Sequence, residues 1–289
     1  MAILNLTPDS FSDGGKHYST NDTISDIDLL ETVDGFIRDG ANIIDIGGQS
    51  SRPFAEDISP TTEISRTAPK IALIKNHLGP LSKIAISIDT YRSTVAQAAI
   101  EAGADIINDV SAGMLDENMF KVMASSGKTV ILGHMRGTPQ TMSSLTDYGK
   151  DNKFLLPNIK SELDVRIVKA LQAGVRPWRI ILDPGFGFAK TEEQNLLLLR
   201  DLDHMIGTKT SQKGSTFKEL GGTVPWMVGT SRKRFIGNVL GIKEPKERVW
   251  GTAATVVMAI QAGACSVRVH DVKEMAQVAK MVDAVRLAV

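Results

Sequence analysis

The chain has 289 residues, of which 42% are hydrophobic, and its 33 Lys and Arg residues balance its 33 Asp and Glu residues. A chain of this length and composition can bury a large core, which excludes intrinsic disorder. The balanced charge lacks the broad positive field that binding to a phosphate backbone needs, because basic residues cluster only locally, as at 231–234. We therefore expect no nucleic-acid partner.

The cysteine content and the hydropathy bear on the compartment. Cys265 is the only cysteine, so the chain forms no internal disulfide, which indicates a reduced, intracellular and cytoplasmic protein. We expect Cys265 to be buried in a strand. No apolar run approaches the ~20 residues of a membrane-spanning helix, so we expect no membrane partner. A strand-like segment begins at Ala2 without a leader, which suggests a domain of a longer polypeptide and leaves a mitochondrial targeting sequence upstream open.

Short β-branched segments alternate with longer segments of helical periodicity, which is the pattern of repeated βα units. In chain order we expect strands at 2–5, 43–46, 84–89, 105–108, 129–134, 180–183, 227–230 and 266–270. We expect helices at 25–39, 62–78, 93–102, 116–126, 155–173, 192–206, 232–240 with 246–262, and 271–288. Gly40, Gly103 and Gly263 each precede an alanine and then a strand, which predicts the same glycine C-cap at three places.

Eight such units predict an α/β fold: a closed (β/α)8 TIM barrel that forms a single domain over 1–289. An open doubly wound sheet is the alternative. No Gly-x-Gly-x-x-Gly follows the first strand, however, so a dinucleotide-binding sheet is disfavoured. The polar stretch 207–222 interrupts the pattern before the seventh strand, and we expect it to be a surface insertion.

In such barrels the active site forms where the strands end, and here the strand ends are polar. The third, fourth and sixth strands end at Asp89, Asn108 and Asp183, whose carboxylate and amide groups suit a flat heterocycle with several N–H donors along its edge. The same groups leave Mg²⁺ bridged by substrate phosphates open as an alternative. A dedicated zinc site is disfavoured, because only one histidine, His270, is expected beside them.

A cationic cluster is predicted where the eighth strand meets the first. Arg268 and His270 leave the same face of the eighth strand, and the neighbouring first strand ends at Asn5. Guanidinium and imidazole donors match the oxygens of a phosphate or pyrophosphate. The alternative is that Arg268 pairs with Asp271 and that His270 only caps the following helix.

The loops after the first two strands, 6–15 and 47–60, are long for βα connections, and we expect them to close over the site. Phe11 and Pro53 are apolar residues in these polar loops. They either wall a pocket for a second substrate or anchor each loop against the barrel.

Seven motifs in order along the whole chain closely resemble the dihydropteroate synthases of folate biosynthesis. They are Ile3 to Gly15 (ILNLTPDSFSDGG), Asp45 to Pro53 (DIGGQSSRP), Ser87-Ile88-Asp89-Thr90, Ile107-Asn108-Asp109, Asp183 to Phe188 (DPGFGF), Ser231-Arg232-Lys233 and Arg268-Val269-His270-Asp271. The resemblance implies a transferase that joins p-aminobenzoate to 6-hydroxymethyl-7,8-dihydropterin pyrophosphate in an SN1-like reaction, with Mg²⁺ as cofactor and with sulfonamides as inhibitors. It also implies a homodimer and, as in fungal members, fusion to upstream folate-pathway domains.

The same resemblance implies roles for individual residues. The pterin ring would be held by Asp89, Asn108, Asp183 and Lys233. The pyrophosphate would be bound by Asn5, Ser51, Arg52, Arg268 and His270, with Asn5 also beside the Mg²⁺ ion. The p-aminobenzoate pocket would be formed by Phe11, Ser51, Arg52, Pro53, Ser231 and Arg234, with a helix N-terminus near Arg232 receiving the carboxylate. The catalytic set would be Asp89, Asp183, Lys233, Arg268 and His270.

Two departures from the common bacterial pattern fall in this site. The second loop has Gln49 and Ser51 where Glu and Thr are more usual, and Arg234 stands where a serine often binds the p-aminobenzoate carboxylate. Two other functions stay open. A methyltetrahydrofolate-type pterin methyltransferase shares the pterin site but needs no pyrophosphate cluster, and a catalytically silent pterin-binding barrel would bind without turnover.

Overall fold

The computed structural model describes residues 1–7, 24–50, 57–206 and 224–288. The predictions made for Phe11, Ser51, Arg52 and Pro53 lie outside these residues, as does the insertion expected at 207–222. Within the described residues, no helix is long and apolar enough to cross a membrane.

The strands form a closed ring. β1 (Ala2–Asn5), β2 (Ile43–Gly47), β3 (Ala85–Asp89), β4 (Ile106–Asp109), β5 (Thr129–Gly133) and β6 (Ile180–Asp183) pair in parallel in chain order, and β7 (Met227–Val228) pairs in parallel with β8 (Ser266–Val267). Single parallel bridges from Leu182 to Trp226 and from Ala2 to Val269 join the two sheets at both edges. The predicted (β/α)8 barrel is confirmed.

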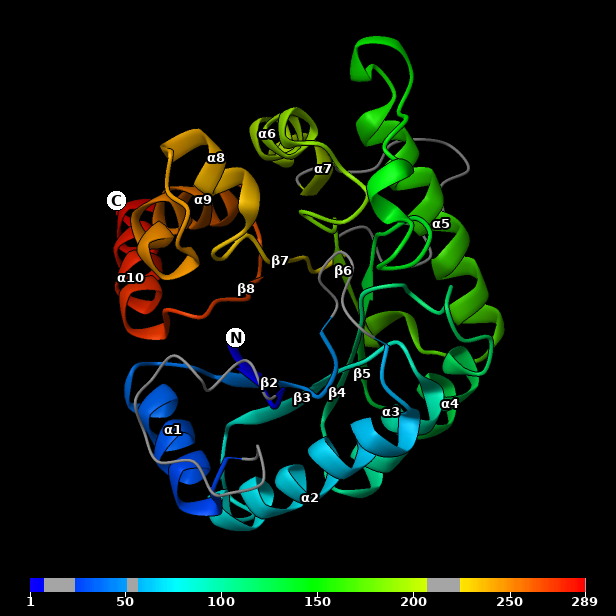
Figure 1. The fold of residues 1–289 in the computed structure, drawn as a ribbon, viewed down its shortest axis with the longest axis vertical. Coiled ribbons are helices and arrows are strands. Elements are labelled where there is room, and N and C mark those ends of the chain that lie inside the picture. The colour runs from blue at the N-terminus through cyan, green and yellow to red at the C-terminus, as the bar shows by residue number, and fades with distance from the viewer. Residues whose placement is uncertain (8–23, 51–56, 207–223, 289) are drawn as a thin grey trace.

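Helices cover the outside of the ring, as Figure 1 shows. They are α1 (Asp26–Arg38), α2 (Pro60–Leu78), α3 (Ser93–Glu101), α4 (Met119–Ser126), α5 (Leu155–Gln172), α6 (Glu192–Arg200), α7 (Leu202–Ile206), α8 (Arg234–Leu240), α9 (Val249–Ala262) and α10 (Val272–Leu287). The single helix expected at 192–206 is divided at Asp201, the C-cap of α6. The helix expected from 232 begins at Arg234, because Arg232 adopts a left-handed backbone conformation with φ of 59°.

The glycine C-caps are confirmed at all three predicted positions. Gly40, Gly103 and Gly263 have φ of 103°, 108° and 104°. In each case the N–H of the following alanine bonds to a carbonyl five residues earlier: Ala41 to Phe36, Ala104 to Ala99 and Ala264 to Ala259. Gly174 (φ 101°) repeats the pattern at the end of α5, where Val175 N–H bonds to Ala170. The same glycine C-cap therefore ends four helices and directs the chain toward the next strand.

The barrel interior has an apolar lower layer and a polar upper one. Ile106, Ile131 and Met227 pack together with the partly buried Met1, Ile43, Ala85 and Ile181. One step closer to the carboxyl ends, the inward positions become polar, at Asp45 and Ser87. Cys265, expected to be buried, is exposed at the start of β8. The polar side chains of the strand ends thus lie above a closed hydrophobic floor.

Candidate active site

The strand register brings the predicted polar residues to one end of the barrel. Asn5 pairs with Gly47, Gly47 with Asp89, and Asp89 with Asn108, so these positions lie at one level of the sheet. Asn108 pairs with Ile131 of β5, and Gly133, two residues further along β5, pairs with Asp183. Because paired residues of parallel strands point to the same side, the side chains of Asn5, Asp89, Asn108 and Asp183 all face inward.

Arg268 joins two carboxylates inside the barrel. Its Nε lies 2.5 Å from Oδ2 of Asp45, and its terminal nitrogen lies 2.6 Å from Oδ2 of Asp89. Asn108 Nδ2 donates to the same oxygen of Asp45 at 3.1 Å. The alternative pairing of Arg268 with Asp271 is wrong, because Asp271 accepts from the guanidinium of Arg232 at 3.0 Å.

Asp45 is a site residue that the sequence did not single out. It lies in the second motif, but no role was expected for it. Its side chain has no exposed surface, and it lies directly below Asp89 and Asn108. Its other oxygen, Oδ1, has no hydrogen-bond partner among the described residues. The signal available in the sequence was its position: two residues before the end of β2, at an inward position.

Burial controls the ionisation of the carboxyl groups. Burial, with smaller contributions from Asp45, Glu63 and Asp109, raises the pKa of Asp89 to about 7 in spite of Arg268. Burial also raises the pKa of Asp183, which the Gly185 N–H and the charges of Lys233, Lys190 and Arg268 oppose. Asp89 can therefore accept a proton near neutrality. Both groups gain from a ligand that presents N–H donors.

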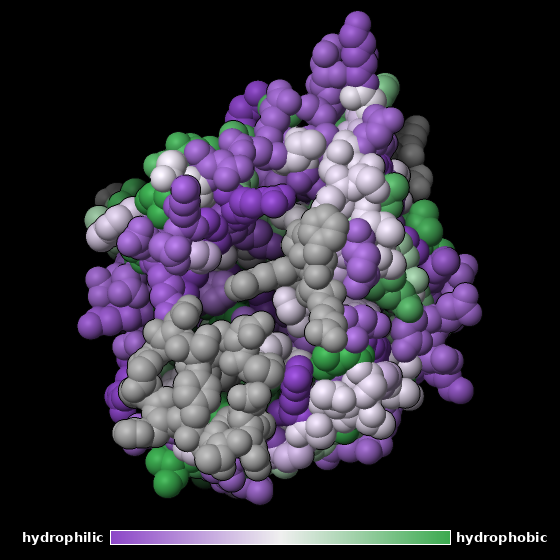
Figure 2. Space-filling model, in the orientation of Figure 1, coloured by the Kyte–Doolittle hydropathy of each residue, from purple (hydrophilic) through white to green (hydrophobic). Residues whose placement is uncertain are grey.

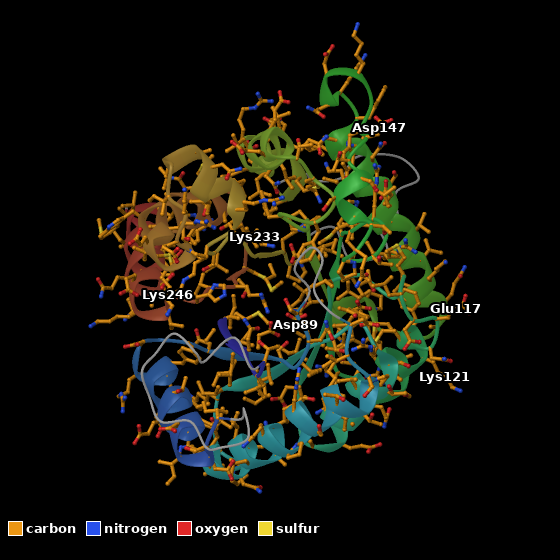
Figure 3. The ribbon with its side chains drawn as sticks, in the orientation of Figure 1. Asp89, Glu117, Lys121, Asp147, Lys233 and Lys246 are labelled. Carbon is orange, nitrogen blue, oxygen red and sulfur yellow. The ribbon has the colours of Figure 1, made fainter. Side chains whose placement is uncertain are left out.

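Asp183 and Lys233 form the other wall of the site. Asp183 Oδ1 accepts from the N–H of Gly185 at 2.8 Å, which fixes the carboxylate over its own turn. Lys233 Nζ donates to the carbonyl of Phe186 and lies 4.2 Å from the ring centre of Phe188. Asp89 and Lys233 lie near the middle of the ring in Figure 3, whereas Glu117, Lys121, Asp147 and Lys246 lie toward its periphery.

A second pocket lies where β1 meets β8. It has a volume of about 190 Å³ and is lined by Ile3, Leu4, Asn5, Thr32, Phe36, Arg232 and His270. His270 Nδ1 lies 3.0 Å from Oγ of Ser231, which also accepts the backbone N–H of His270 at 3.1 Å. Figure 2 shows hydrophilic residues around the hollow on this face. Asn5 and His270 were expected to form one cluster with Arg268; both line this pocket, whereas Arg268 is not among its lining residues.

Ser231 and Arg234 are differently placed. Ser231 is buried against His270, and Arg234 is exposed at the first residue of α8. α8 has only seven residues and begins beyond Arg232, so the helix N-terminus expected near Arg232 lies at Lys233 and Arg234 instead. Among the residues described here, no group of three His, Cys, Asp or Glu side chains is placed to hold a metal ion.

Three further polar residues, all outside the motifs, form a hydrogen-bonded chain that ends at the turn after Asp183. Lys190 is buried, and its Nζ lies 3.0 Å from Nδ1 of His134, whose Nε2 lies 3.1 Å from Glu162. His134 is the last residue of the strand expected at 129–134, and no role was predicted for it. Lys190 stands two residues beyond the fifth motif. Glu162 lies on α5, so no pattern in the sequence connects it with them.

These features define a TIM barrel with carboxylates gathered at the strand ends, and comparison identifies its class. Residues 1–270 match the family of pterin binding enzymes, and the chain belongs to this family. The dihydropteroate synthase of Synechocystis is 46% identical over 284 residues, covering 98% of this chain and 89% of that protein. The crystal structure of FolP, a dihydropteroate synthase of Clostridium difficile determined in the presence of pteroic acid, superimposes with a TM-score of 0.81 at 38% identity and covers 98% of this chain and 95% of that one.

Other relatives are longer polypeptides. The folic acid synthesis protein fol1 of Schizosaccharomyces pombe is 45% identical over 286 residues, which cover 99% of this chain but only 36% of that protein. The chain therefore spans about a third of that fungal relative and most of the Synechocystis enzyme.

Proposed function

We propose that this chain is a dihydropteroate synthase, which joins 6-hydroxymethyl-7,8-dihydropterin pyrophosphate to p-aminobenzoate and releases 7,8-dihydropteroate and pyrophosphate. The observation that carries the proposal is the cluster in which Arg268 links Asp45 and Asp89 beside Asn108. This cluster stands beside a second pocket with cationic and amide groups. A pterin with an anionic leaving group needs both parts of this site: the carboxylate cluster for the ring, and the pocket with cationic and amide groups for the leaving group.

The pterin would lie between Asp89, Asn108, Asp183 and Lys233. A carboxylate such as Asp183 accepts two parallel hydrogen bonds from a ring amine and the adjacent ring N–H, as it would from a guanidinium. Asp89 and Asn108 offer an acceptor and an amide on the opposite side of the ring. The raised pKa of Asp89 means that part of the free protein carries a proton there, which the ligand must displace.

The reaction begins with cleavage of the bond between the pterin methylene carbon and the pyrophosphate oxygen. The electron pair leaves with the pyrophosphate, and the positive charge spreads into the electron-rich pterin. In this proposal Asp89 and Asp183 stabilise that cation, and Arg268 and His270 stabilise the anion. Preorganised charges of this kind contribute about 3 kcal/mol each. The amine of p-aminobenzoate then bonds to the methylene carbon and releases a proton to water, so the reaction needs no protein nucleophile.

Asn5 fits the Mg²⁺ ion that this reaction would use. Its amide oxygen is a hard ligand in the pocket that also holds Arg232 and His270. One amide oxygen suits a Mg²⁺ ion held chiefly by substrate phosphates and water rather than by a protein cage. The ion would neutralise charge on the departing pyrophosphate.

The p-aminobenzoate pocket would lie on the outer side of the pterin, near Ser231 and Arg234. Ser231 is engaged by His270, so its hydroxyl would contact p-aminobenzoate only while it also holds that histidine. Arg234, exposed at the start of α8, would reach the carboxylate from the rim. Phe11, Ser51, Arg52 and Pro53 keep their predicted roles as part of this proposal.

Assembly and cellular context form the coarser part of the proposal. α9 and α10 expose large apolar side chains, with Trp250 78%, Met281 65% and Val285 60% accessible, which supports a homodimer through these helices. The match to one part of the fungal polypeptide supports fusion to other folate-pathway domains. The proposed location is intracellular: cytoplasmic, or mitochondrial if the parent polypeptide carries a targeting sequence.

The test is formation of dihydropteroate by the purified chain with dihydropterin pyrophosphate, p-aminobenzoate and Mg²⁺, beside Arg268→Ala. Coupled release of pyrophosphate and dihydropteroate, lost in Arg268→Ala, is the expected result. Pterin binding without turnover would instead support the silent barrel. Transfer of a methyl group from methyltetrahydrofolate would support the methyltransferase.

A further inference from the structure

Lys190 is a buried lysine that holds both ends of one turn. Only 8% of the residue is exposed, and its Nζ donates to the carbonyls of Gly185 at 2.9 Å and Phe188 at 3.1 Å. The third direction is taken by Nδ1 of His134 at 3.0 Å. An ammonium has three N–H donors, so these three acceptors satisfy it fully.

Glu162, itself bound by Arg136, fixes the tautomer in which His134 accepts from Lys190. Its Nε2 faces Glu162 at 3.1 Å, and Arg136 binds the same carboxylate through Nε at 3.0 and 3.1 Å. Since a carboxylate only accepts, the ring proton belongs on Nε2 and leaves the Nδ1 lone pair for Lys190. Burial lowers the pKa of His134 to about 4, so the ring is neutral at physiological pH.

The turn that Lys190 holds contains three left-handed backbone conformations, of which the one at Ala189 is strained because this residue has a Cβ. Gly185, Gly187 and Ala189 all have positive φ, at 72°, 76° and 49°. A Cβ on Gly185 would lie 1.9 Å from the carbonyl oxygen of His134, so the turn packs directly on the end of β5. Such a conformation persists only where surrounding contacts fix it. Lys190 supplies two of these contacts from a position where water does not compete.

The same turn carries the pterin wall. Asp183 stands at its start, and Phe186 and Phe188 provide the carbonyl and the ring that hold Lys233. The charge of Lys190 also favours the ionised form of Asp183, as do the charges of Lys233 and Arg268. A change at Lys190 would therefore reach both Asp183 and Lys233 without touching the p-aminobenzoate side.

We propose that Lys190, held by His134 and Glu162, is a positioning residue for the pterin subsite: it fixes the turn that carries Asp183 and supports Lys233. The inference rests on the proposed function, and it concerns pterin affinity specifically. Lys190 touches no reacting atom, so it acts through the turn alone.

The test compares Lys190→Met, His134→Leu and His134→Gln with the wild-type chain. Calorimetry with 6-hydroxymethylpterin measures pterin affinity, and steady-state kinetics give KM for each substrate. We expect Lys190→Met and His134→Leu to weaken pterin binding by about tenfold or more, the value of a hydrogen bond to a charged group. His134→Gln should recover most of the affinity, because its amide can accept from Lys190 and donate to Glu162. KM for p-aminobenzoate should change by less than about threefold in all of them.

Lys75→Met is the matched control, since Lys75 also pairs with a carboxylate, Asp105 at 3.0 Å, but near the opposite end of the strands. It should bind pterin as the wild type does. If Lys190→Met does not fold, the two His134 variants decide the matter. Equal loss for both substrates, or unchanged pterin affinity in folded variants, overturns the inference; failure of the wild-type chain to bind pterin overturns the proposed function instead.

A pH series separates this role from simple packing. Burial lowers the pKa of Lys190 to about 7, opposed by Asp183 and Glu162 and reinforced by Lys233 and Arg136, with the neutral His134 in contact. As pH rises, wild-type Lys190 loses its charge, which Lys190→Met lacks at every pH, and keeps only the weaker hydrogen bonds of a neutral amine. The ratio of the Lys190→Met to the wild-type dissociation constant should therefore fall between about pH 6 and about pH 9. Ionisation of the ligand affects both dissociation constants equally and so does not change their ratio. A ratio that stays constant with pH contradicts the inference.

Discussion

Arg268 places its Nε 2.5 Å from an oxygen of Asp45, a carboxyl group with no exposed surface. The pair links β2 to the residue that follows β8, and these two strands lie on either side of β1 once the barrel closes. The guanidinium also reaches Asp89. Together with Asp89, Asp45 raises the pKa of Arg268, so the guanidinium is charged at any pH at which the protein folds. Asp45 thus fixes the direction of a cation that the proposed reaction needs.

Asp45→Asn should show whether Asp45 orients Arg268 through its charge or only through the shape of its side chain. The substitution keeps the size of the side chain but removes a buried charge that pairs with Arg268, and we expect a loss of about 1–3 kcal/mol in unfolding free energy. KM for the pterin substrate should rise by about tenfold. Urea unfolding and kinetics provide the measurements. The same substitution at Asp26, whose pairing with Lys70 is exposed, should cost less than about 1 kcal/mol. Equal effects at the two positions would contradict the role of Asp45.

The pH dependence of pterin use should report Asp89. Burial raises the pKa of this group to about 7, so the carboxylate that accepts the pterin N–H donors is lost as pH falls below that value. We expect kcat/KM for dihydropterin pyrophosphate to fall about tenfold for each pH unit well below 7. Initial rates at limiting pterin check this. Asp89→Asn, already lacking the charge, should show low activity without that acid limb, and a profile flat down to pH 5 in the wild type would refute the assignment.

Acid should destabilise the fold through His134 and Glu162. The folded pKa of His134, about 4, lies below its ordinary 6.5, so the unfolded chain binds more protons in between and stability falls as pH drops from 6.5 toward 4. Arg136 and His134 lower the pKa of Glu162 to about 2, so further stability is lost as pH falls from 4.5 toward 2. The His134 contribution is of the order of 3 kcal/mol.

Chemical denaturation from pH 7 to pH 4 measures this contribution. His134→Gln retains the hydrogen-bonding pattern but cannot titrate, so its stability should fall less over that range than that of the wild type. His77→Gln serves as the control, because His77 is partly exposed beside Asp34. Parallel curves for wild type and His134→Gln would show that His134 is not the titrating group.

The exposed apolar surface of α9 and α10 should hold two copies together. We expect sedimentation to give the mass of a dimer for the wild type and of a monomer for Trp250→Glu with Met281→Glu, since a charge buried in an apolar contact is costly. Leu81→Glu is a suitable control, because Leu81 is 94% exposed in the connection before β3. A wild type that sediments as a monomer at high concentration would refute the dimer.

Much of the fold was accessible from sequence patterns, for local reasons. The glycine caps at Gly40, Gly103 and Gly263 follow from the steric freedom of a residue without a Cβ, which acts over a single turn of helix. Strand positions followed from β-branched runs. The strands expected at 227–230 and 266–270 were predicted too long. β7 and β8 each have only two residues, and the polar residues that follow them lie outside the strands. The division at Asp201 was missed because helical periodicity continues across it.

The sequence by itself determined which polar residues stand at the strand ends and, through the order of the βα units, that Asn5, Asp89, Asn108 and Asp183 meet at one end of a barrel. Only the tertiary structure decided their partners. Arg268 lies 223 positions from Asp45, and several carboxylates come within its reach once the ring closes. Local preferences act over only a few residues. Whether Arg268 pairs with Asp45 or with Asp271, and whether Lys190 bonds to His134, depends on burial and side-chain direction, which exist only in the packed barrel.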